Sequence, residues 1–486
     1  MTYQIKNHDK PKTTNNKDVN MINMKALFNP KSVAALGASG NSGKLGFHVM
    51  KSLINGGFSK KVVPVNPGSP EVWGLKAYPS LNDYTNSIDL AIVVVPAKLV
   101  PGVFTECVEK GVKGIVLITA GFKEIDDPSG ANLHEKIAGI VNPAGIPVIG
   151  PNTFGMINFH TNLNASFTPE FSLLKKGKIA LVSQSGGISH LLGFLAMRAN
   201  ASFSKIIGLG NRLNVDFAEI IDYLIDDSNT NVIMLYMEGI DNPMRFIETV
   251  KKHKNKKPII IYKTGSSEKS DQAAKSHTGS MAGKYEIYEG AFSQAGILVL
   301  DSAESLLDTA KAIASSEIPE GPGVAVLSGQ AGPGLAACDV CEACGLKIVS
   351  FERQTQQSIN EFLPPLALRS NPVDMGPAWY NASAQSGIIR AVMNDSNVDA
   401  ILLLIMFASA NADLLVDLSS FLKIFKLKKP IISCILAPPG TWDDDIHSLE
   451  KSGALVNYPT PEQAARALAN IVKYRSIQFD YKIAKG

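Results

Sequence analysis

Short runs of valine and isoleucine alternate with longer amphipathic stretches along most of the chain. Each apolar run is closed by Gly, Pro or Asn, and helical patterns of about 10–15 residues separate the runs. This alternation is typical of a doubly wound parallel sheet. The runs are Val33–Leu36, Val62–Val65, Leu90–Val95, Gly114–Ile118, Val148–Ile149, Lys178–Val182, Lys205–Gly208, Val232–Met237, Pro258–Tyr262, Ile297–Leu300 and Val324–Leu327.

The runs fall into three modules, and the last two modules share landmarks in the same order. Gly177–Gly187 is echoed by Gly323–Gly332, Lys256–Ile260 by Lys428–Ile432, and Gly296–Val299 by Gly453–Val456. These echoes predict a divergent internal repeat. Only the first copy carries the polar segment Lys275–Gly283. Because a shared scaffold does not require this segment, it indicates chemistry added to one copy.

Composition narrows the class of protein. The 486 residues correspond to about three domains. A balance of 47 Lys and Arg against 44 Asp and Glu gives no reason to expect nucleic acid or an anionic membrane as partner. No apolar run approaches the ~18 residues of a membrane span. The first 26 residues carry five Lys, no Arg and no apolar core, which predicts a polar tail and a cytoplasmic protein.

Three of the five cysteines form a C-x-x-C-x-x-C run at Cys338, Cys341 and Cys344. The spacing resembles part of an iron–sulfur motif, but no Cys-Pro follows and the run continues an Ala-rich helical pattern. We therefore expect reduced thiols packed on a helix and no metal site.

A Gly-rich segment, Gly37–Gly46, follows the first strand and opens a helix. Such a turn presents backbone N–H groups that suit a phosphate. Its glycines recur every third position, unlike the dinucleotide fingerprint. It also differs from a P-loop, which would need Gly at Ala38 and Ser or Thr at Leu45.

The residues at the end of the second strand help to distinguish NAD from other phosphate-bearing ligands. It reads Val65-Asn66-Pro67, whereas an NAD site usually has an acidic residue there. The pattern favours a phosphate-bearing ligand with adenine near Asn66 and Pro67 over NAD. A purely structural glycine turn is the remaining alternative.

A second group of polar residues lies in the middle module. His277 stands between small residues in the polar segment Ser276–Gly279, Glu238 ends the central strand, and Ser183–Gly187 joins the first strand to a helix. A solvent-exposed or structural histidine is the plainer interpretation of His277. However, strand ends of one parallel sheet face one crevice. A neutral imidazole oriented by a carboxylate is a competent nucleophile toward phosphorus, and the helix start offers donors to an anion.

Taken together, these motifs resemble the acyl-CoA synthetases (NDP-forming). This family includes the ADP-forming acetate–CoA ligases and is related to succinyl-CoA synthetase. The resemblance covers roughly Leu27 to Arg475 and is carried by the Gly-rich turn, Val65–Pro67, Thr119–Phe122, Gly150–Gly155, Ser183–Gly187, Tyr236–Gly239 and Ser276–Gly279.

The resemblance implies an α/β fold with a Rossmann-like CoA-binding domain and two flavodoxin-like, succinyl-CoA synthetase-like parallel-sheet domains. The implied boundaries are a polar tail over 1–26, a CoA-binding domain over 27–160, a phosphohistidine domain over 161–317, its copy over 318–475 and a tail over 476–486.

The resemblance also implies a role for each candidate residue. His277 would be the phosphorylated nucleophile, and Glu238 would orient and stabilise it. The phosphate would be bound by Ser183, Ser185, Gly186, Gly187, Thr278 and Gly279, and CoA by Gly37, Ser39, Gly40, Asn41, Lys44, Asn66, Pro67, Pro96 and Asn152.

Two positions depart from the family pattern. Thr153 stands where Cys is often found, a tolerable change at a pantetheine-side turn. Arg212 follows the Gly210-Asn211 loop, where relatives more often have acidic residues, so the resemblance implies a difference in acid specificity or coupling there. A lone loop arginine is usually solvated.

Fused members of the family carry an ATP-grasp domain, and all three modules are accounted for when this chain ends at Gly486. The resemblance therefore implies an alpha subunit that works with a separate ATP-grasp beta subunit, as an α2β2 heterotetramer, with ATP or ADP and Mg²⁺ on the partner. The substrate would be a small carboxylic acid such as acetate or propionate, with sulfoacetate or succinate as anionic alternatives. A CoA-binding regulatory or scaffold protein and an NAD-dependent oxidoreductase are the other hypotheses.

Overall fold

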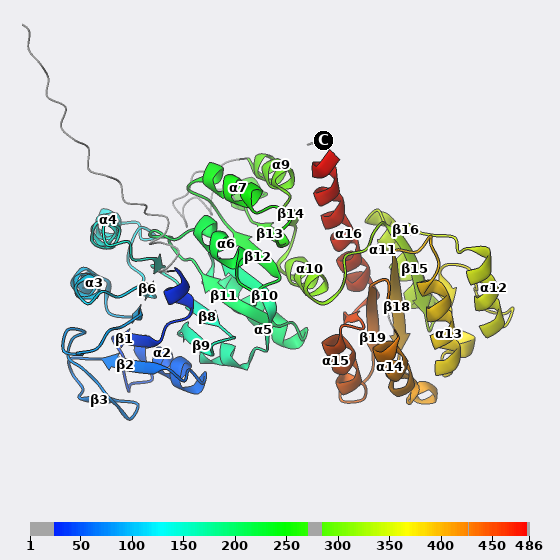
Figure 1. Cartoon of the computed structure of the whole chain (residues 1–486), viewed down its shortest axis with the longest axis horizontal. Coiled ribbons are helices and arrows are strands. Elements are labelled where there is room, and N and C mark those ends of the chain that lie inside the picture. The colour runs from blue at the N-terminus through cyan, green and yellow to red at the C-terminus, as the bar shows by residue number, and fades with distance from the viewer. Residues whose placement is uncertain (1–23, 271–283, 426, 484–486) are drawn as a thin grey trace, which may run out of the picture. The chain divides into compact units, whose positions relative to one another are not determined.

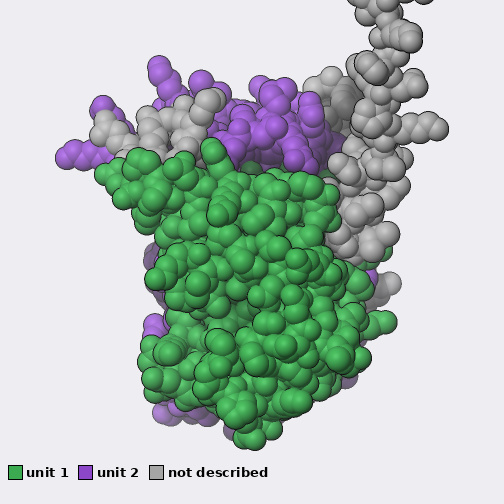
Figure 2. Space-filling model, turned by 90° about the vertical axis from the view of Figure 1, so that its left-hand side faces the viewer, with its two compact units in different colours: residues 1–172, 207–223 green, residues 173–206, 224–486 purple. Residues whose placement is uncertain are grey.

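The computed structural model describes residues 24–270, 284–425 and 427–483 (Figure 1). The chain forms two compact units, coloured separately in Figure 2. The first contains the chain up to Ser172 together with Ile207–Tyr223, and the second contains Leu173–Ile206 and the chain from Leu224 onward. The predicted domain boundaries stay a prediction. Within the described ranges, no helix is long and apolar enough to cross a membrane.

A five-stranded parallel sheet is the centre of the first unit, with strand order β2-β1-β5-β6-β7. Its strands are β1 (Ser32–Leu36), β2 (Lys61–Val65), β5 (Leu90–Val93), β6 (Gly114–Leu117) and β7 (Val148–Ile149), and its helices are α2 (Leu45–Asn55), η1 (Ala97–Leu99), α3 (Val100–Glu109) and α4 (Pro128–Val141). The strand order reverses at β1, which lies between β2 and β5. The carboxyl end of β1 is therefore at a topological switch point, where open α/β sheets bind ligands.

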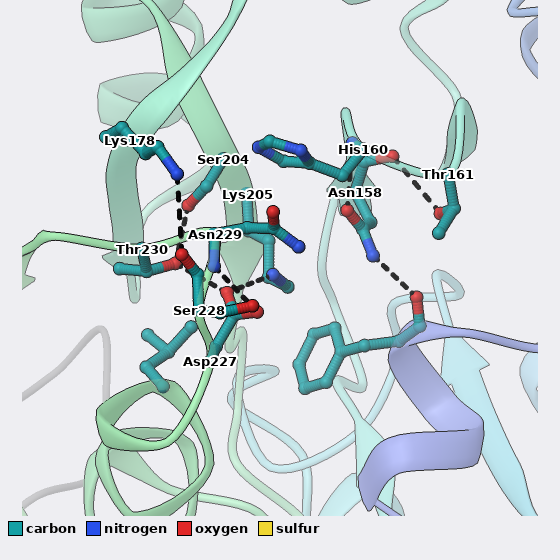
Figure 3. Close-up of polar contacts among 12 residues, drawn as sticks. Asn158, His160, Thr161, Lys178, Ser204, Lys205, Asp227, Ser228, Asn229 and Thr230 are labelled. Atoms are coloured by element: carbon teal, nitrogen blue, oxygen red, sulfur yellow. Dashed lines mark hydrogen bonds and ion pairs between the residues drawn. The ribbon is translucent and has the colours of Figure 1, made fainter.

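Two antiparallel hairpins in this unit were not predicted from the sequence. They are β3 (Glu71–Val72) with β4 (Leu75–Lys76), and β8 (Gly155–Asn158) with β9 (Leu163–Ser166). Their strands are too short or too polar to give an apolar run. The side-chain amide of Asn158 donates a hydrogen bond to the carbonyl oxygen of Phe28 (2.9 Å, Figure 3), so β8 is held to the segment before β1.

In the second unit, five strands of a seven-stranded sheet follow the order β14-β13-β12-β10-β11. Its strands are β10 (Lys176–Ser183), β11 (Phe203–Gly208), β12 (Val232–Met237), β13 (Ile259–Lys263) and β14 (Leu298–Leu300), and the helices along this part of the chain are η2 (Pro169–Leu173), α5 (Gly186–Arg198), α6 (Phe217–Ile225), α7 (Pro243–Lys252), α9 (Tyr285–Ala295) and α10 (Ala303–Ser315). Each of these strands coincides with a predicted run within a few residues.

The second sheet repeats this order as β20-β19-β18-β15-β16, with β17 also paired to β15. Its strands are β15 (Gly323–Ser328), β16 (Lys347–Ile348), β17 (Val373–Asp374), β18 (Ala400–Met406), β19 (Ile431–Leu436) and β20 (Val456–Asn457), and its helices are α11 (Ala331–Ala343), α12 (Arg353–Phe362), η3 (Gly376–Ala378), α13 (Ala382–Met393), η4 (Ser409–Asn411), α14 (Leu414–Ile424), α15 (Asp443–Ser452) and α16 (Pro461–Ile483).

Matching helix ends support the predicted repeat. Gly296 ends α9 and Gly453 ends α15, both with left-handed backbone conformations (φ +87° and +76°) that favour glycine. Each glycine is followed closely by an edge strand, β14 or β20. The landmark shared by the two copies is thus a helix stop before the edge strand.

A buried lysine joins β11 to the loop after α6. Lys205 is 1% exposed, and its ammonium group pairs with the carboxylate of Asp227 (Figure 3). The hydroxyl of Thr230 also donates to this carboxylate (2.7 Å). Burial by itself raises the pKa of Asp227, but the hydrogen bonds from Lys205 and Thr230 outweigh it and leave the pKa below its ordinary value.

We expect the substitution Lys205→Met to lower the free energy of unfolding of the second unit by about 3–5 kcal/mol, because it leaves a half-buried carboxylate without its cation. Lys178→Met is the matched control, since Lys178 is exposed and only its ammonium contact to Ser228 is lost. Its effect should stay within about 0.5 kcal/mol. Urea unfolding of both variants measures this, and equal midpoints would contradict the stabilising role of Lys205.

Candidate functional site

The Gly-rich loop connects β1 to α2 through close backbone contacts. Gly37 has a φ of +94° and its N–H donates to the carbonyl oxygen of Val65 (3.0 Å). A Cβ atom on Gly46 would lie 1.9 Å from the carbonyl oxygen of Gly37. Helix α2 can therefore begin this close to the loop only because residue 46 is glycine.

Side chains inside the loop hold its shape. The hydroxyl of Ser39 accepts from the N–H of Asn41 (3.0 Å), and the side-chain oxygen of Asn41 accepts from the N–H of Gly43 (2.8 Å). The side-chain amide of Asn66 donates to the carbonyl oxygen of Ala38 (2.8 Å). Ser39 and Asn66 thus act first on the loop itself, and their predicted contact with CoA stays a prediction.

The outer side of the loop has the features of an anion site. Gly40, Asn41, Gly43 and Lys44 are exposed. Helix α2 begins with no side-chain cap on its first N–H groups and no acidic residue in its first turn. Uncapped N–H groups and the helix dipole favour a bound anion at such a terminus. Lys44, at the N-cap, adds a positive charge.

The other predicted CoA-binding residues follow strands of the same sheet. Asn66 and Pro67 come directly after β2, Pro96 follows β5, and Asn152 follows β7. Asn152 adopts a left-handed conformation (φ +57°) and donates its amide to Asn211 (3.4 Å). The structure therefore brings the predicted residues to one edge of the five-stranded sheet.

Glu124 was not predicted, although it organises this edge. Its carboxylate accepts from the backbone N–H groups of Gly121 and Phe122 and from the side-chain amide of Asn211. Burial alone would raise the pKa of Glu124, but these hydrogen bonds outweigh it and leave the pKa below its ordinary value. The group is therefore held as a carboxylate. The motifs Thr119–Phe122 and Gly210-Asn211 were its only signal in the sequence.

Arg212 corrects an expectation. The sequence suggested a solvated loop arginine, but Arg212 is 6% exposed and its Nε lies 3.7 Å from the carboxylate of Asp216. The reason is local: the backbone turns through a left-handed conformation at Arg212 (φ +53°), four residues before its acidic partner.

The second unit places the predicted phosphate-binding residues at the end of β10. Ser183 is fully buried, and its hydroxyl donates to the carbonyl oxygen of Ser185 (2.9 Å). Ser185 is the N-cap of α5, where its hydroxyl accepts from the N–H of Ile188 (3.3 Å). Gly186 and Gly187 form the first turn, and Gly187 is exposed. The predicted residues thus form an ordered helix start.

Gln184 joins this helix start to β12. Its backbone N–H donates to the carbonyl oxygen of Tyr236 (3.3 Å), and its side-chain oxygen accepts from the N–H groups of Glu238 (2.5 Å) and Gly239 (3.1 Å). We call the two side-chain hydrogen bonds the Gln184 clamp. The clamp fixes the backbone of Glu238 beside the start of α5.

The Glu238 side chain is half-buried and contacts the hydroxyl of Tyr236 (3.4 Å). That hydroxyl also lies 3.5 Å from the hydroxyl of Thr264, which follows β13. Burial raises the pKa of Tyr236 to about 12; the hydrogen bond with Thr264 opposes this rise, and the nearby charge of Glu238 adds to it. Tyr236 therefore stays a protonated donor to Glu238 at neutral pH. From the sequence, Tyr236 was recognised only as part of the motif Tyr236–Gly239, without a role of its own.

His277, Thr278 and Gly279 lie outside the described residues, within 271–283. Their predicted roles stay predictions. In the chain they fall between β13 and α9, and β13 is the direct neighbour of β12 in the sheet.

The second copy differs at this point of the sheet. Ser183 pairs in register with Tyr236, and its counterpart Ser328 pairs with Leu404. Counting two residues on, Glu238 corresponds to Met406. Gln330 hydrogen-bonds the backbone of Met406 (3.3 and 3.1 Å) but gives α11 no side-chain cap. The copy keeps the scaffold and lacks the carboxylate and the serine cap.

Comparison with known proteins identifies two domains. Residues 31–158 match the family described as a CoA binding domain, and residues 176–313 match the succinyl-CoA ligase like flavodoxin domain. The alpha subunit of acetate–CoA ligase (ADP-forming) II from Pyrococcus furiosus is 38% identical over 458 residues, covering 92% of this chain and 97% of the relative. The alpha subunit of acetate–CoA ligase (ADP-forming) I from the same organism is 33% identical, covering 95% and 100%.

A solved structure agrees with these matches. The dinucleotide forming acetyl-coenzyme A synthetase 1 of Ca. Korarchaeum cryptofilum, in complex with phosphate and ADP, superposes with a TM-score of 0.87 at 32% identity, covering 95% of this chain and 98% of that chain. A CoA-binding domain followed by this flavodoxin domain defines an acyl-CoA ligase of the class that forms a nucleoside diphosphate. Within that class, the chain belongs to the family of ADP-forming acetate–CoA ligases and matches its alpha subunits.

We expect Gly46→Ala to destabilise the first unit by about 1–3 kcal/mol, because the new methyl group would overlap the backbone of Gly37. This steric effect should outweigh the gain in helix propensity, which is about 1 kcal/mol. Gly40→Ala is the control, since no atom lies within 4 Å of its Cβ position. The melting temperatures of both variants test this prediction. A melting temperature of Gly46→Ala equal to that of the wild type would contradict the close loop–helix contact.

Proposed function

We propose that this chain is the alpha subunit of an ADP-forming acid–CoA ligase that works through a phosphohistidine at His277. The overall reaction is carboxylate, CoA and ATP to acyl-CoA, ADP and phosphate. The observation that carries the proposal is the Gln184 clamp, which sets Glu238 beside the capped start of α5. The second copy has Met406 in place of Glu238 and no side-chain cap on α11, which supports a specific use for the carboxylate and the cap in the first copy.

In the first proposed step, a nitrogen of the His277 imidazole attacks the γ-phosphorus of ATP, and ADP leaves. Glu238 would accept a hydrogen bond from the other ring nitrogen, which orients the imidazole and stabilises its charge. Tyr236 donates to Glu238 and so restricts the orientation of the carboxylate.

The phosphoryl group would rest against the start of α5. Ser185 caps Ile188, while Gly186 and Gly187 present backbone without side chains that could block an anion. The positive end of the helix dipole favours the phosphoryl charge. Thr278 and Gly279 would complete this cradle.

In the later steps, a carboxylate oxygen of the acid attacks the phosphorus and releases the imidazole. The CoA thiolate then attacks the acyl carbon, and phosphate leaves. Phosphorylation is needed because it turns a carboxylate oxygen into a leaving group. Run backwards, the same steps form ATP from an acyl-CoA.

CoA itself would occupy the edge of the first unit. The exposed backbone of Gly40–Gly43, with Lys44, would hold the pyrophosphate, and the adenine would lie near Asn66 and Pro67. The turns at Pro96 and Asn152 would border the pantetheine arm. Glycine at position 40 leaves open space for this ligand, since nothing lies within 4 Å of its Cβ position.

A beta subunit would supply the ATP-grasp domain, with ATP and Mg²⁺, in an α2β2 assembly. The relatives named alpha subunits of acetate–CoA ligases support this division, because they match this chain over 97–100% of their length. Their names also favour acetate or a similar small acid. Arg212 is ion-paired with Asp216, so it gives no support for an acid with a second negative charge.

Transfer of label from ATP tests the phosphohistidine. With γ-³²P-ATP, the chain and its beta subunit, we expect acid-labile, base-stable label on the wild-type chain and no label on His277→Ala. His160→Ala, in the β8–β9 hairpin, should keep the label and serves as control. The chains are separated under denaturing conditions, so label on the beta subunit is scored apart.

Stable label on His277→Ala would overturn the assignment of the nucleophile. If the wild-type chain takes no label and forms no acyl-CoA yet binds CoA, the ligase proposal fails and a regulatory CoA-binding protein is the better description.

A further inference from the structure

A cavity of about 610 Å³ lies within the second unit, away from the Gln184 clamp. It is bordered by the ends of β19 and β20, by α10 and α15, and by the C-terminal end of α5. The carboxyl edge of a parallel sheet is where α/β proteins usually bind ligands. In the second copy, this cavity occupies that edge.

A buried carboxyl group faces the cavity without a hydrogen-bond donor. Asp308, on α10, is 8% exposed and lines the cavity. Among the described residues, none donates a hydrogen bond to its carboxylate. The hydroxyl of Tyr458 donates instead to the backbone oxygen of Asp308 (2.6 Å). Its carboxylate oxygens open onto the cavity, so a donor bound there would supply the hydrogen bonds that the protein does not.

The cation nearest to Asp308, Lys311, is paired with other groups. Lys311, one helical turn after Asp308, pairs with Glu450 (2.7 Å) and donates to the carbonyl oxygen of Asn457 (2.8 Å). Lys175 is bonded to Asn200 (2.8 Å). Five carboxyl side chains line the cavity, against three of lysine and arginine. The excess of negative charge favours a positively charged ligand.

Part of the wall is apolar. Leu195, Leu307 and Ile446 line the cavity together with the end of β19. A ligand that suits both parts carries a hydrogen-bonding cation at one end and a short hydrocarbon chain at the other.

We propose that this cavity binds a small primary amine, whose ammonium group donates hydrogen bonds to the carboxylate of Asp308. Its hydrocarbon chain lies against Leu195, Leu307 and Ile446. The ammonium supplies the donor that Asp308 lacks, and it reduces the negative charge of the cavity. The site is independent of the ligase chemistry, since it shares no residue with the clamp or with the Gly-rich loop.

Isothermal titration calorimetry of the full-length chain at pH 8, without ATP or CoA, tests the site. The probes are n-butylamine, 1,4-diaminobutane and spermidine. Tetramethylammonium has the charge but no N–H donor, and n-butanol has the chain but no charge. We expect at least one amine to bind with a Kd below about 1 mM, and both comparison compounds to bind at least about tenfold more weakly.

Two variants connect the binding to Asp308. Asp308→Asn should weaken amine binding at least about tenfold, because the charged acceptor is lost. Asp444→Asn removes an exposed carboxylate at the rim and should change binding less than about twofold. Burial raises the pKa of Asp308 to about 7, so the fold disfavours its charge, and Asp308→Asn should melt no lower than wild type at pH 8.

The proposal is overturned if none of the three amines binds, if tetramethylammonium binds equally well, or if Asp308→Asn binds like wild type. None of these outcomes bears on the label transfer to His277.

Discussion

The side-chain oxygen of Gln184 accepts hydrogen bonds from two backbone N–H groups that follow the neighbouring strand, those of Glu238 and Gly239. A parallel sheet brings all its carboxyl ends to one edge, but it does not fix where a side chain beyond a strand end lies. The clamp does so for Glu238. Gln184 is 7% exposed, so these hydrogen bonds are shielded from water and are strengthened by the low local dielectric constant.

The two copies in the second unit separate scaffold from chemistry. Both keep the serine at the end of the first strand, the order of the strands and the glycine after the outer helix. Only the first has a carboxylate after the central strand and a serine cap on the following helix; the second has Met406 and Gln330. In the second copy, a cavity lined by the buried carboxyl group of Asp308 lies at the carboxyl edge of the sheet.

Much of this fold could be predicted from the sequence because parallel strands buried on both faces form apolar runs. The positions of β1, β12 and β15 follow directly from such runs. Ser185 was predicted at a helix start, where its cap is local. The hairpin at β3 and β4 escaped prediction because its strands are two residues each.

Features set by contacts distant in sequence were harder. The partner of Gln184 lies 54 residues away, and no local pattern specifies it. Arg212 was expected in solvent, but the backbone turn and Asp216 bury it. The loop containing His277 was singled out because only one copy has it; its role stays a prediction.

The rate of phosphoryl transfer from ATP to the chain, in the presence of the beta subunit, tests the central claim most directly when Gln184→Leu is compared with Gln330→Leu. Each variant loses a glutamine side chain that hydrogen-bonds a strand end, buried at Gln184 and half-buried at Gln330, so both should lower stability. The account predicts that only Gln184→Leu slows the transfer, by about tenfold or more. Equal rates in the two variants would show that the clamp supports the fold alone and would contradict the account.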